Sequence, residues 1–213
     1  QIIYFLLYRL LIMAIFDENP NLIFDNIKNL LVKGVKERNH PFHTPIFSNI
    51  DKNDNSNARI VVLRKFDDKS LILNFHTDYR SPKILELKKN NKSFFVFYDY
   101  KIKIQLRINT ISYIQNQNDV TQKAWKETRL SSRKCYLTEK FPSSKTSFPE
   151  DGIPDHLKGV DPTKDESEKG YNNFTVIENK IKNIDWLYLA SSGHRRLNIN
   201  IENKIIKFNW LIP

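Results

Sequence analysis

Residues 101–109 alternate between polar and apolar side chains without interruption. The apolar and polar positions are Ile102, Ile104, Leu106 and Ile108 against Lys101, Lys103, Gln105, Arg107 and Asn109. Successive side chains of a β-strand point to opposite faces, so this period of two predicts a strand with one apolar and one polar face. Such strands are typical of antiparallel sheets that have one face on the core. We therefore expect the chain to fold around an antiparallel sheet.

The rest of the chain adds more strands than helices. Further strands are predicted over 58–66, 71–77, 93–100, 174–177, 184–190, 195–201 and 205–211. A turn at 67–69 would join the first two into a hairpin with Arg59 close to Thr77 at its open end. Helices are predicted over 19–37, 81–89 and 119–133. Hairpin-linked strands with few helices favour a mainly β (α+β) fold, an antiparallel barrel with peripheral helices.

The length of 213 residues favours one domain over 1–213, with 138–172 as a long surface loop rich in proline. Residues 1–16 are almost wholly apolar but fall short of the ~20 residues needed to span a bilayer, and Arg9 interrupts them. We expect no membrane span and a native start at Met13, with 1–12 upstream of it. The alternative is an apolar N-terminal helix or strand that packs on the body.

Several chemistries lack their sequence signals. The chain has no GxGxxG, GxxxxGK[ST] or GxSxG motif, which removes the main support for dinucleotide, P-loop and serine-hydrolase sites. His40 and His43 have no carboxylate or cysteine at a metal-ligand interval, so no metal site is expected. Cys135 is the single cysteine and has no paired histidine; a semi-buried, unreactive thiol in a reducing, cytoplasmic compartment is the simplest interpretation.

The charge points to an anionic partner. Lys and Arg total 34 against 24 Asp and Glu, a net charge of +10. Arg59 and Lys83 are expected to meet at the start of the 81–89 helix beside Ser81, an arrangement that suits a phosphate. The alternative is that these are solvated charges at strand ends. A nucleic-acid-binding barrel is a further alternative, but it would spread its cations along several strands, whereas the cations here gather around one helix start.

Five motifs in this order resemble the pyridoxamine 5'-phosphate oxidase family, an FMN-binding split β-barrel: RIVVLR (59–64), FHTDYRSPK (75–83), QLRI (105–108), HRR (194–196) and WLIP (210–213). The resemblance runs from about residue 22 to the C-terminus. It is closest to a divergent branch in which RSPK stands where other members have SRK. It implies a six-stranded split barrel that forms a two-fold homodimer with FMN at the subunit interface.

The resemblance also implies site residues. Those implied for FMN are Arg59, Ile60, Val61, Val62, Arg64, His76, Thr77, Arg80, Ser81, Lys83, Gln105 and Arg107. Those implied for a small phosphorylated substrate are Arg64, Arg129, Arg133 and Arg196. Pro82 replaces an arginine of the family, and Arg80 is expected to restore its charge. No catalytic residue is assigned.

The C-terminal part departs from the family pattern. Asn198 stands where the oxidases have a substrate histidine, Asn200 where they have a flavin-contacting arginine, and Leu187 where a tryptophan stacks on the flavin. We therefore expect an FMN-dependent oxidoreductase that transfers a hydride to flavin, with weak or no pyridoxamine phosphate oxidase activity. A genuine oxidase producing pyridoxal phosphate and a non-enzymatic FMN or nucleic-acid binding barrel remain as alternatives.

Overall fold

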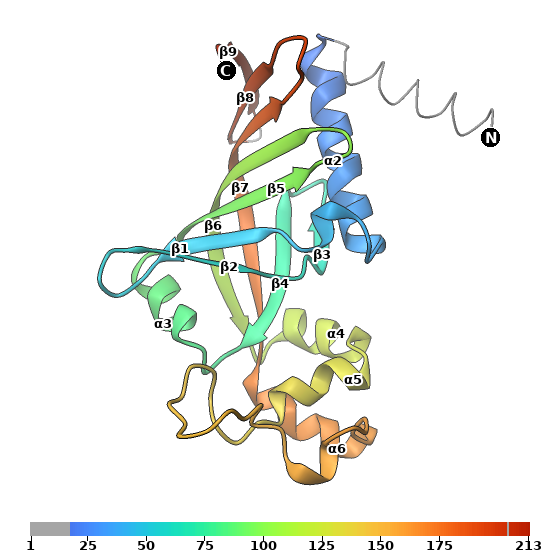
Figure 1. Cartoon of the computed structure of the whole chain (residues 1–213), viewed down its shortest axis with the longest axis vertical. Helices are drawn as coiled ribbons and strands as arrows, with labels where there is room; N and C mark the ends of the chain where they lie inside the picture. The colour runs from blue at the N-terminus through green and yellow to red at the C-terminus, as the bar shows by residue number, and fades with distance from the viewer. Residues whose placement is uncertain (1–17, 204) are drawn as a thin grey trace, which may run out of the picture.

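A nine-stranded antiparallel sheet organises the protein in the computed structural model, which describes residues 18–203 and 205–213. Its main path runs β2-β1-β5-β6-β7-β4-β3, and β8 and β9 extend it from β7 (Figure 1). The strands are β1 (Ile46–Ile50), β2 (Ser56–Ile60), β3 (Lys65–Asp67), β4 (Ile72–Asp78), β5 (Lys92–Asp99), β6 (Ile104–Asn116), β7 (Phe174–Tyr188), β8 (Arg195–Glu202) and β9 (Ile205–Leu211). The sheet is open, as in a split barrel, which confirms the predicted class, and it has three more strands than the six that the resemblance implies.

Helices flank the sheet at both ends. The α-helices of the described residues are α2 (Pro20–Lys36), α3 (Pro82–Lys89), α4 (Asp119–Glu127), α5 (Leu130–Arg133) and α6 (Lys164–Glu168). Helix α2 begins as predicted, because the side chain of Asn19 accepts a hydrogen bond from the N–H of Asn21 and Pro20 occupies the first turn. In Figure 1, α2 lies against one end of the sheet and α4–α6 gather at the other. None of the described helices is long and apolar enough to cross a membrane.

The predicted hairpin of 58–66 with 71–77 is confirmed only next to its turn, and the pairing predicted for its far end is wrong. β2 pairs with β1, where Arg59 lies opposite Phe47, and only the short β3 pairs with β4. After β2 the N–H groups of Val61 and Leu63 donate to the carbonyls of Pro45 and His43, so residues 61–63 run beside residues 43–45 rather than beside β4. Arg59 is therefore not a cross-strand neighbour of Thr77.

Other boundaries also differ from the sequence predictions. β1 lies in the stretch 39–57, where no strand was predicted, since its strand character comes from pairing with β2 and β5 rather than from its own short sequence. β7 is continuous over what the sequence presented as two pieces. The 119–133 helix breaks at Thr128, and the predicted 138–172 loop contains α6. The proposed start at Met13 lies outside the described residues.

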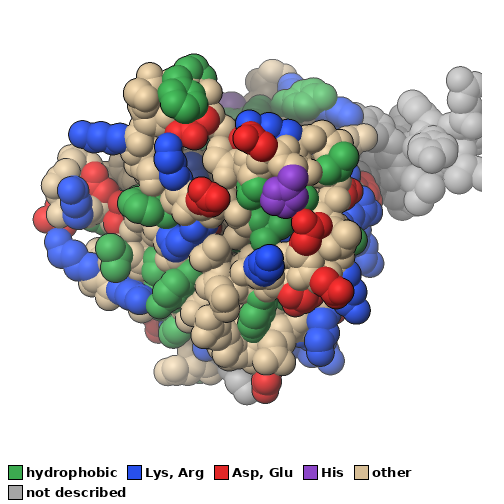
Figure 2. Space-filling view, turned by 90° about the horizontal axis from the view of Figure 1, so that it is seen from below, with side chains coloured by type: hydrophobic (Ala, Val, Ile, Leu, Met, Phe, Trp, Pro, Cys, Tyr) green, Lys and Arg blue, Asp and Glu red, His purple; other side chains and the backbone are tan. Residues whose placement is uncertain are grey.

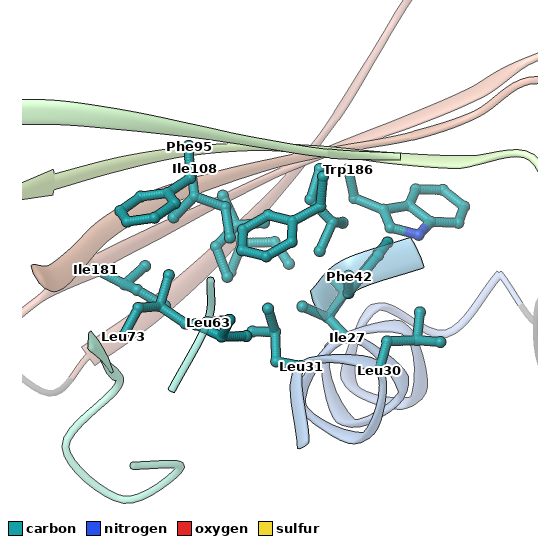
Figure 3. Packing of buried hydrophobic residues seen from close by; sticks show 14 of the residues in the cluster. Ile27, Leu30, Leu31, Phe42, Leu63, Leu73, Phe95, Ile108, Ile181 and Trp186 are labelled. Atoms are coloured by element: carbon teal, nitrogen blue, oxygen red, sulfur yellow. The ribbon is translucent and has the colours of Figure 1, made fainter. Parts of the chain in front are cut away.

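The main core lies between α2 and one face of the sheet. Helix α2 contributes Ile27, Leu30 and Leu31, which face Phe42, Leu63 and strand residues such as Ile108 and Trp186 in Figure 3. β6 confirms its predicted alternation, because Ile104, Leu106 and Ile108 are fully buried. This burial fixes the sheet register, and with it the direction in which every polar side chain of β6 points.

A second, smaller core ties α4–α6 to the lower end of β7. Its members are Trp125, Tyr136, Phe174 and Val176. The rings of Trp125 and Phe174 lie 5.0 Å apart, and those of Tyr136 and Phe174 lie 5.1 Å apart. This cluster holds α4 beside the outer face of β4 and β7, which creates the cleft described below.

Candidate functional site: a cation cluster and an adjoining cleft

The first part of the site lies where α3 meets β2 and β4. Lys83 Nζ donates to Thr77 Oγ1 at 2.9 Å and to Ser81 Oγ at 2.6 Å. The Arg59 guanidinium donates to Asn49 Oδ1 and lies 4.0 Å from Glu86 Oε2. The structure thus brings Arg59, Thr77, Ser81 and Lys83 together, as predicted, although through α3 rather than through the expected hairpin.

Burial destabilises the charged forms of Arg59 and Lys83. Desolvation and, to a smaller extent, the neighbouring Arg59 lower the pKa of Lys83 to about 8, although Glu86 and Asp78 act in the opposite sense. Desolvation also lowers the pKa of Arg59, against the effect of Glu86. Two half-buried cations share mainly one carboxylate, Glu86, so an added anion would be stabilised here.

The α3 N-terminus contributes less than the sequence suggested. Pro82 has no N–H group, and the N–H of Ile84 already donates to the Ser81 carbonyl at 2.9 Å. The side chains of Arg59 and Lys83, with the two hydroxyls, are therefore the main groups available to a phosphate. A terminal phosphate monoester suits this donor set, since cations and hydroxyls form charge-assisted hydrogen bonds to its oxygens.

Residues 59–64 lead from the cation cluster to a cleft. Ile60 is 69% exposed, Val61 and Val62 are partly exposed, and Leu63 is anchored in the core. The N–H of Arg64 donates to the Asn74 carbonyl at 2.8 Å, which fixes the end of the segment against β4. An open apolar surface thus joins Arg59 to the exposed Arg64.

The cleft has a volume of about 780 Å³ and lies between the end of α2, the outer face of β4–β7, and α4–α5. Its floor is Asn74, His76, Val176 and Glu178. Its charged lining residues are Lys36, Arg38, Arg64, Lys65, Lys123 and Arg129 against Asp119, Glu127 and Glu178. Cations outnumber carboxylates two to one, and the predicted Arg64, His76 and Arg129 all line this space.

His76 is held neutral at the cleft floor. Its ring packs against Phe174 at 4.8 Å in an edge-on arrangement. Desolvation lowers the pKa of His76 to about 3, with a further contribution from Arg64. At neutral pH His76 therefore presents an uncharged imidazole, which can both donate and accept hydrogen bonds.

Two of the predicted arginines are engaged in holding the lower region together. Arg80 donates to both carboxylate oxygens of Asp78 and to the carbonyl of Thr138. Its guanidinium is paired with Asp78, so the structure gives no support to the expectation that Arg80 restores the charge lost at Pro82. Arg133 is buried over the Trp125 ring and donates to Glu168, so the structure gives no support to its predicted contact with substrate.

The remaining predicted arginines form a separate cluster on the outer face of β6–β8. Arg107 and Arg196 both donate to Asp185 Oδ2 at 2.8 Å. Gln105 lies on the same face, opposite Leu187, and Leu187 is opposite Arg196. Asn198 and Asn200 continue this polar surface through hydrogen bonds to Asn183. In the part of the chain that the structure describes, no hydrogen bond or ion pair joins this face to the Arg59–Lys83 cluster.

Sequence reasoning missed several cleft residues. Lys36, Lys123 and Asn74 were not singled out, although Asn74 lies two positions before His76 and therefore shares its face of β4. That spacing was the available signal. No group of three or more His, Cys, Asp or Glu side chains that could hold a metal occurs in the part of the chain that the structure describes.

Figure 2 shows one end of the molecule, where positive and negative side chains are intermixed. Lys and Arg side chains are scattered among Asp and Glu, with no continuous basic stripe on this face. An oligonucleotide groove along several strands would need such a stripe. The visible surface therefore gives no support to nucleic-acid binding.

A protein-family model matches the part of the chain that holds much of this site. Residues 25–115 match the model described as pyridoxamine 5'-phosphate oxidase, FMN-binding domain. This span includes the cation cluster, the 59–64 segment and the floor of the cleft on β4. A search of curated proteins finds no match.

Solved structures share the fold at low identity. A pyridoxamine 5'-phosphate oxidase-related, FMN-binding protein from Nostoc punctiforme PCC 73102 is 16% identical, with a TM-score of 0.67 over 89% of this chain and 96% of that one. PhzG from Burkholderia lata 383, solved with tetrahydrophenazine-1-carboxylic acid, is 14% identical, with a TM-score of 0.69 over 92% and 95%. The fold defines a split barrel of the class that these proteins share. Residues 25–115 are therefore similar to the FMN-binding domain of pyridoxamine 5'-phosphate oxidases, and the chain shares its fold with these solved structures.

Proposed function

We propose that the protein binds FMN, with its terminal phosphate held by Arg59, Lys83, Thr77 and Ser81. The observation that carries this proposal is the convergence of four groups. Arg59 and Lys83 are neighbouring, partly desolvated cations, and the hydroxyls of Thr77 and Ser81 accept hydrogen bonds from Lys83. The family model for residues 25–115 supports a flavin as the bearer of the phosphate. The exposed surface of Ile60, Val61 and Val62 would take the apolar ring system.

We further propose that the protein is an FMN-dependent oxidoreductase whose substrate lies in the cleft. Bound FMN would supply a hydride acceptor, which no amino-acid side chain provides. Arg64 and Arg129 would hold an anionic group of a small phosphorylated substrate. The neutral His76 would face the reacting part of the substrate without adding charge to the site.

Pyridoxamine phosphate oxidase activity is expected to be weak or absent. Asn198 and Asn200 form an amide cluster with Asn183, where the oxidases have a histidine and an arginine. Arg196 is paired with Asp185 and is less available to a substrate phosphate. A peroxide-coupled assay with pyridoxamine and pyridoxine phosphates tests this point; turnover of about 1 per second or more, the ordinary enzyme range, would instead indicate a genuine oxidase.

A two-fold homodimer in the cytoplasm completes the proposal. A flavin on Ile60 would be open to solvent on one side of a single chain, since Ile60 is 69% exposed. A second copy would close that side and exclude water from the flavin. A single cysteine, which rules out an internal disulfide, suits a reducing compartment. Sedimentation should show a flavin-loaded dimer, and a flavin-loaded monomer would contradict the dimer.

A flavin titration tests the cofactor directly. FMN should bind more tightly than riboflavin, because the site is built around a phosphate, and the Arg59→Ala, Lys83→Ala double variant should lose at least about tenfold in FMN affinity, or ~1.4 kcal/mol. Lys88→Ala is the matched control, since Lys88 lies on the same helix but donates to the Tyr79 hydroxyl at an exposed position. Absence of flavin quenching in the wild-type protein would refute the proposal.

A further inference from the structure

Asn49 is a polar residue at a core position of β1. Asn49 and Phe47 share one face of the strand, where Phe47 is fully buried and Asn49 is 2% exposed. On β2, Arg59 lies opposite Phe47 and Asn57 lies opposite Asn49, so Arg59 and Asn49 are diagonal neighbours on the same face of the sheet. Burial of an amide is unfavourable unless its groups are hydrogen-bonded, so the partners of Asn49 explain why this position is polar.

The amide of Asn49 joins the two sides of the cation cluster. Its Nδ2 donates to Glu86 Oε2 on α3 at 2.8 Å and to the Ile50 carbonyl at 3.0 Å. Its Oδ1 accepts from the Arg59 guanidinium on β2. An amide turned by half a rotation would bring its oxygen to two acceptors and its hydrogens to a donor, so the three partners fix its orientation.

The Arg59 guanidinium has little else to hold it. Among the residues that the structure describes, Asn49 is its one hydrogen-bond partner, since Glu86 Oε2 lies 4.0 Å from the nearest guanidinium nitrogen. The guanidinium carbon lies 5.7 Å from the centre of the Phe47 ring. Several N–H groups of the guanidinium therefore stay available to an anion, while one hydrogen bond sets the direction in which they point.

We propose that Asn49 is a positioning residue, which holds the Arg59 guanidinium in the orientation that receives the terminal phosphate of the flavin. This inference rests on the proposed function, since it concerns the phosphate end of the same site. Glu86 supports the arrangement from α3 by accepting a hydrogen bond from the Asn49 amide. Without Asn49, the long Arg59 side chain samples other rotamers and loses more conformational entropy when it binds a phosphate.

Asn49→Leu replaces the amide with an apolar side chain of the same branching. It should weaken FMN binding about fivefold and leave riboflavin within roughly twofold of wild type, because riboflavin has no phosphate for Arg59 to bind. Asn49→Thr is the second variant and should act in the same direction, since threonine suits a strand but has a single hydroxyl in place of the amide. Flavin fluorescence titrations measure both affinities.

Asn179→Leu is the matched control for a buried asparagine. Asn179 is fully buried on β7 of the same sheet, but its hydrogen bonds go to Leu73, Ile177 and Ser112. Its substitution should lower Tm, because it leaves those partners unpaired, and should leave the ratio of FMN affinity to riboflavin affinity unchanged.

A double-mutant cycle tests whether Asn49 acts through Arg59. Arg59→Ala alone should weaken FMN binding about fivefold. Adding Asn49→Leu to Arg59→Ala should then change FMN affinity by less than roughly twofold, because the side chain that Asn49 positions is already absent. A residue that supported the fold in general would show its full effect in both backgrounds.

Glu86→Gln separates position from charge. Glutamine keeps an oxygen that can accept from the Asn49 amide, but it removes the negative charge near Arg59 and Lys83. FMN binding should therefore tighten, by about threefold, rather than weaken. Weaker FMN binding in this variant would mean that the charge of Glu86, rather than Asn49, orients Arg59.

Other outcomes would also overturn the inference while leaving FMN binding intact. Equal FMN affinities of wild type and Asn49→Leu would show that Arg59 needs no support. An equal loss for FMN and riboflavin, a full effect of Asn49→Leu in the Arg59→Ala background, or a failure of both Asn49 variants to fold would make Asn49 a structural residue. Absence of FMN binding in the wild type would instead refute the proposed function.

Discussion

Lys83 Nζ lies 2.9 Å from Thr77 Oγ1 and donates a hydrogen bond to it. This contact joins the first turn of α3 to the end of β4, two elements that the sequence separates by a turn around Arg80. It holds the ammonium group beside Arg59 in a half-buried position, where its pKa falls to about 8. Anion binding at this cluster therefore depends on pH within an accessible range.

FMN affinity should fall as pH rises above 8. Lys83 is charged below its pKa of about 8 and loses its proton above it, which removes one charge-assisted hydrogen bond to the phosphate. A bound phosphate raises the Lys83 pKa in the complex, so the loss of affinity begins near pH 8 and levels off at higher pH; we expect roughly tenfold in total. Flavin fluorescence titrations from pH 7 to 10 measure it. Lys83→Arg, which stays charged, should abolish the dependence, and an unchanged profile in that variant would assign the titration to another group.

Folding stability should fall with acid because of His76. Its folded pKa of about 3 lies below the ordinary 6.5, so between these values the unfolded chain binds a proton that the folded chain refuses. Stability is therefore lost as pH falls from about 6.5 towards 3, by at most about 1.4 kcal/mol per pH unit and by less because the ring is partly exposed.

Urea unfolding of wild type and His76→Tyr at pH 7, 6 and 5 isolates this contribution. The tyrosine variant should lose stability less steeply, since tyrosine is neutral throughout this range. His156→Gln is the control, because His156 is exposed and pairs only at the surface with Glu166. Parallel stability curves for wild type and His76→Tyr would contradict the assignment.

The sequence was informative where a pattern depends on local physics. The alternation of β6 and the helices predicted over 19–37 and 81–89 follow from backbone periodicity and the chemistry of helix ends, and they were confirmed. The convergence of Arg59 and Lys83 was also predicted, but for a wrong reason. The order of strands in the sheet depends on long-range pairing. β1 lies between β2 and β5, although the sequence of Ile46–Ile50 does not predict this position.

The sequence does not predict which arginines are buried and which are exposed. Arg129 and Arg133 lie one helical turn apart and are chemically identical, yet Arg129 is exposed in the cleft and Arg133 is buried against Trp125. Burial of a cation depends on the partners that the fold assembles, here Glu168 from a distant helix. Asn74 escaped notice for the same reason, since only the folded structure shows that its oxygen lacks a donor.

Gly34 should not tolerate a side chain. It lies in the last turn of α2, and a Cβ at this position would sit 2.8 Å from both Cβ and O of Phe42, which is fully buried. Gly34→Ala should therefore destabilise the fold by about 1–3 kcal/mol through overpacking, partly offset by ~1 kcal/mol of helix propensity. Thermal unfolding measures the balance. Asn29→Ala on the exposed face of α2 should be neutral or slightly stabilising, and a similar gain at Gly34 would show that Phe42 moves aside freely.

Arg133 and Arg129 should separate stability from ligand binding. Arg133 lies 4.5 Å above the Trp125 ring, and donates to the carbonyls of Thr128 and Trp125 and to Glu168. Arg133→Met removes these bonds and leaves buried acceptors unpaired, so we expect a loss of about 3 kcal/mol or more in unfolding free energy, with a change in tryptophan fluorescence.

Arg129→Ala should leave stability within about 0.5 kcal/mol of wild type, as for most exposed positions, and should instead weaken phenyl phosphate binding to the FMN-loaded protein. Urea unfolding and calorimetry on both variants give the two readouts from the same preparations. The two effects should therefore be reversed between the variants. If Arg133→Met folded with wild-type stability and lost only anion affinity, Arg133 would be a ligand contact rather than the clamp between α4, α5 and α6 that the structure shows.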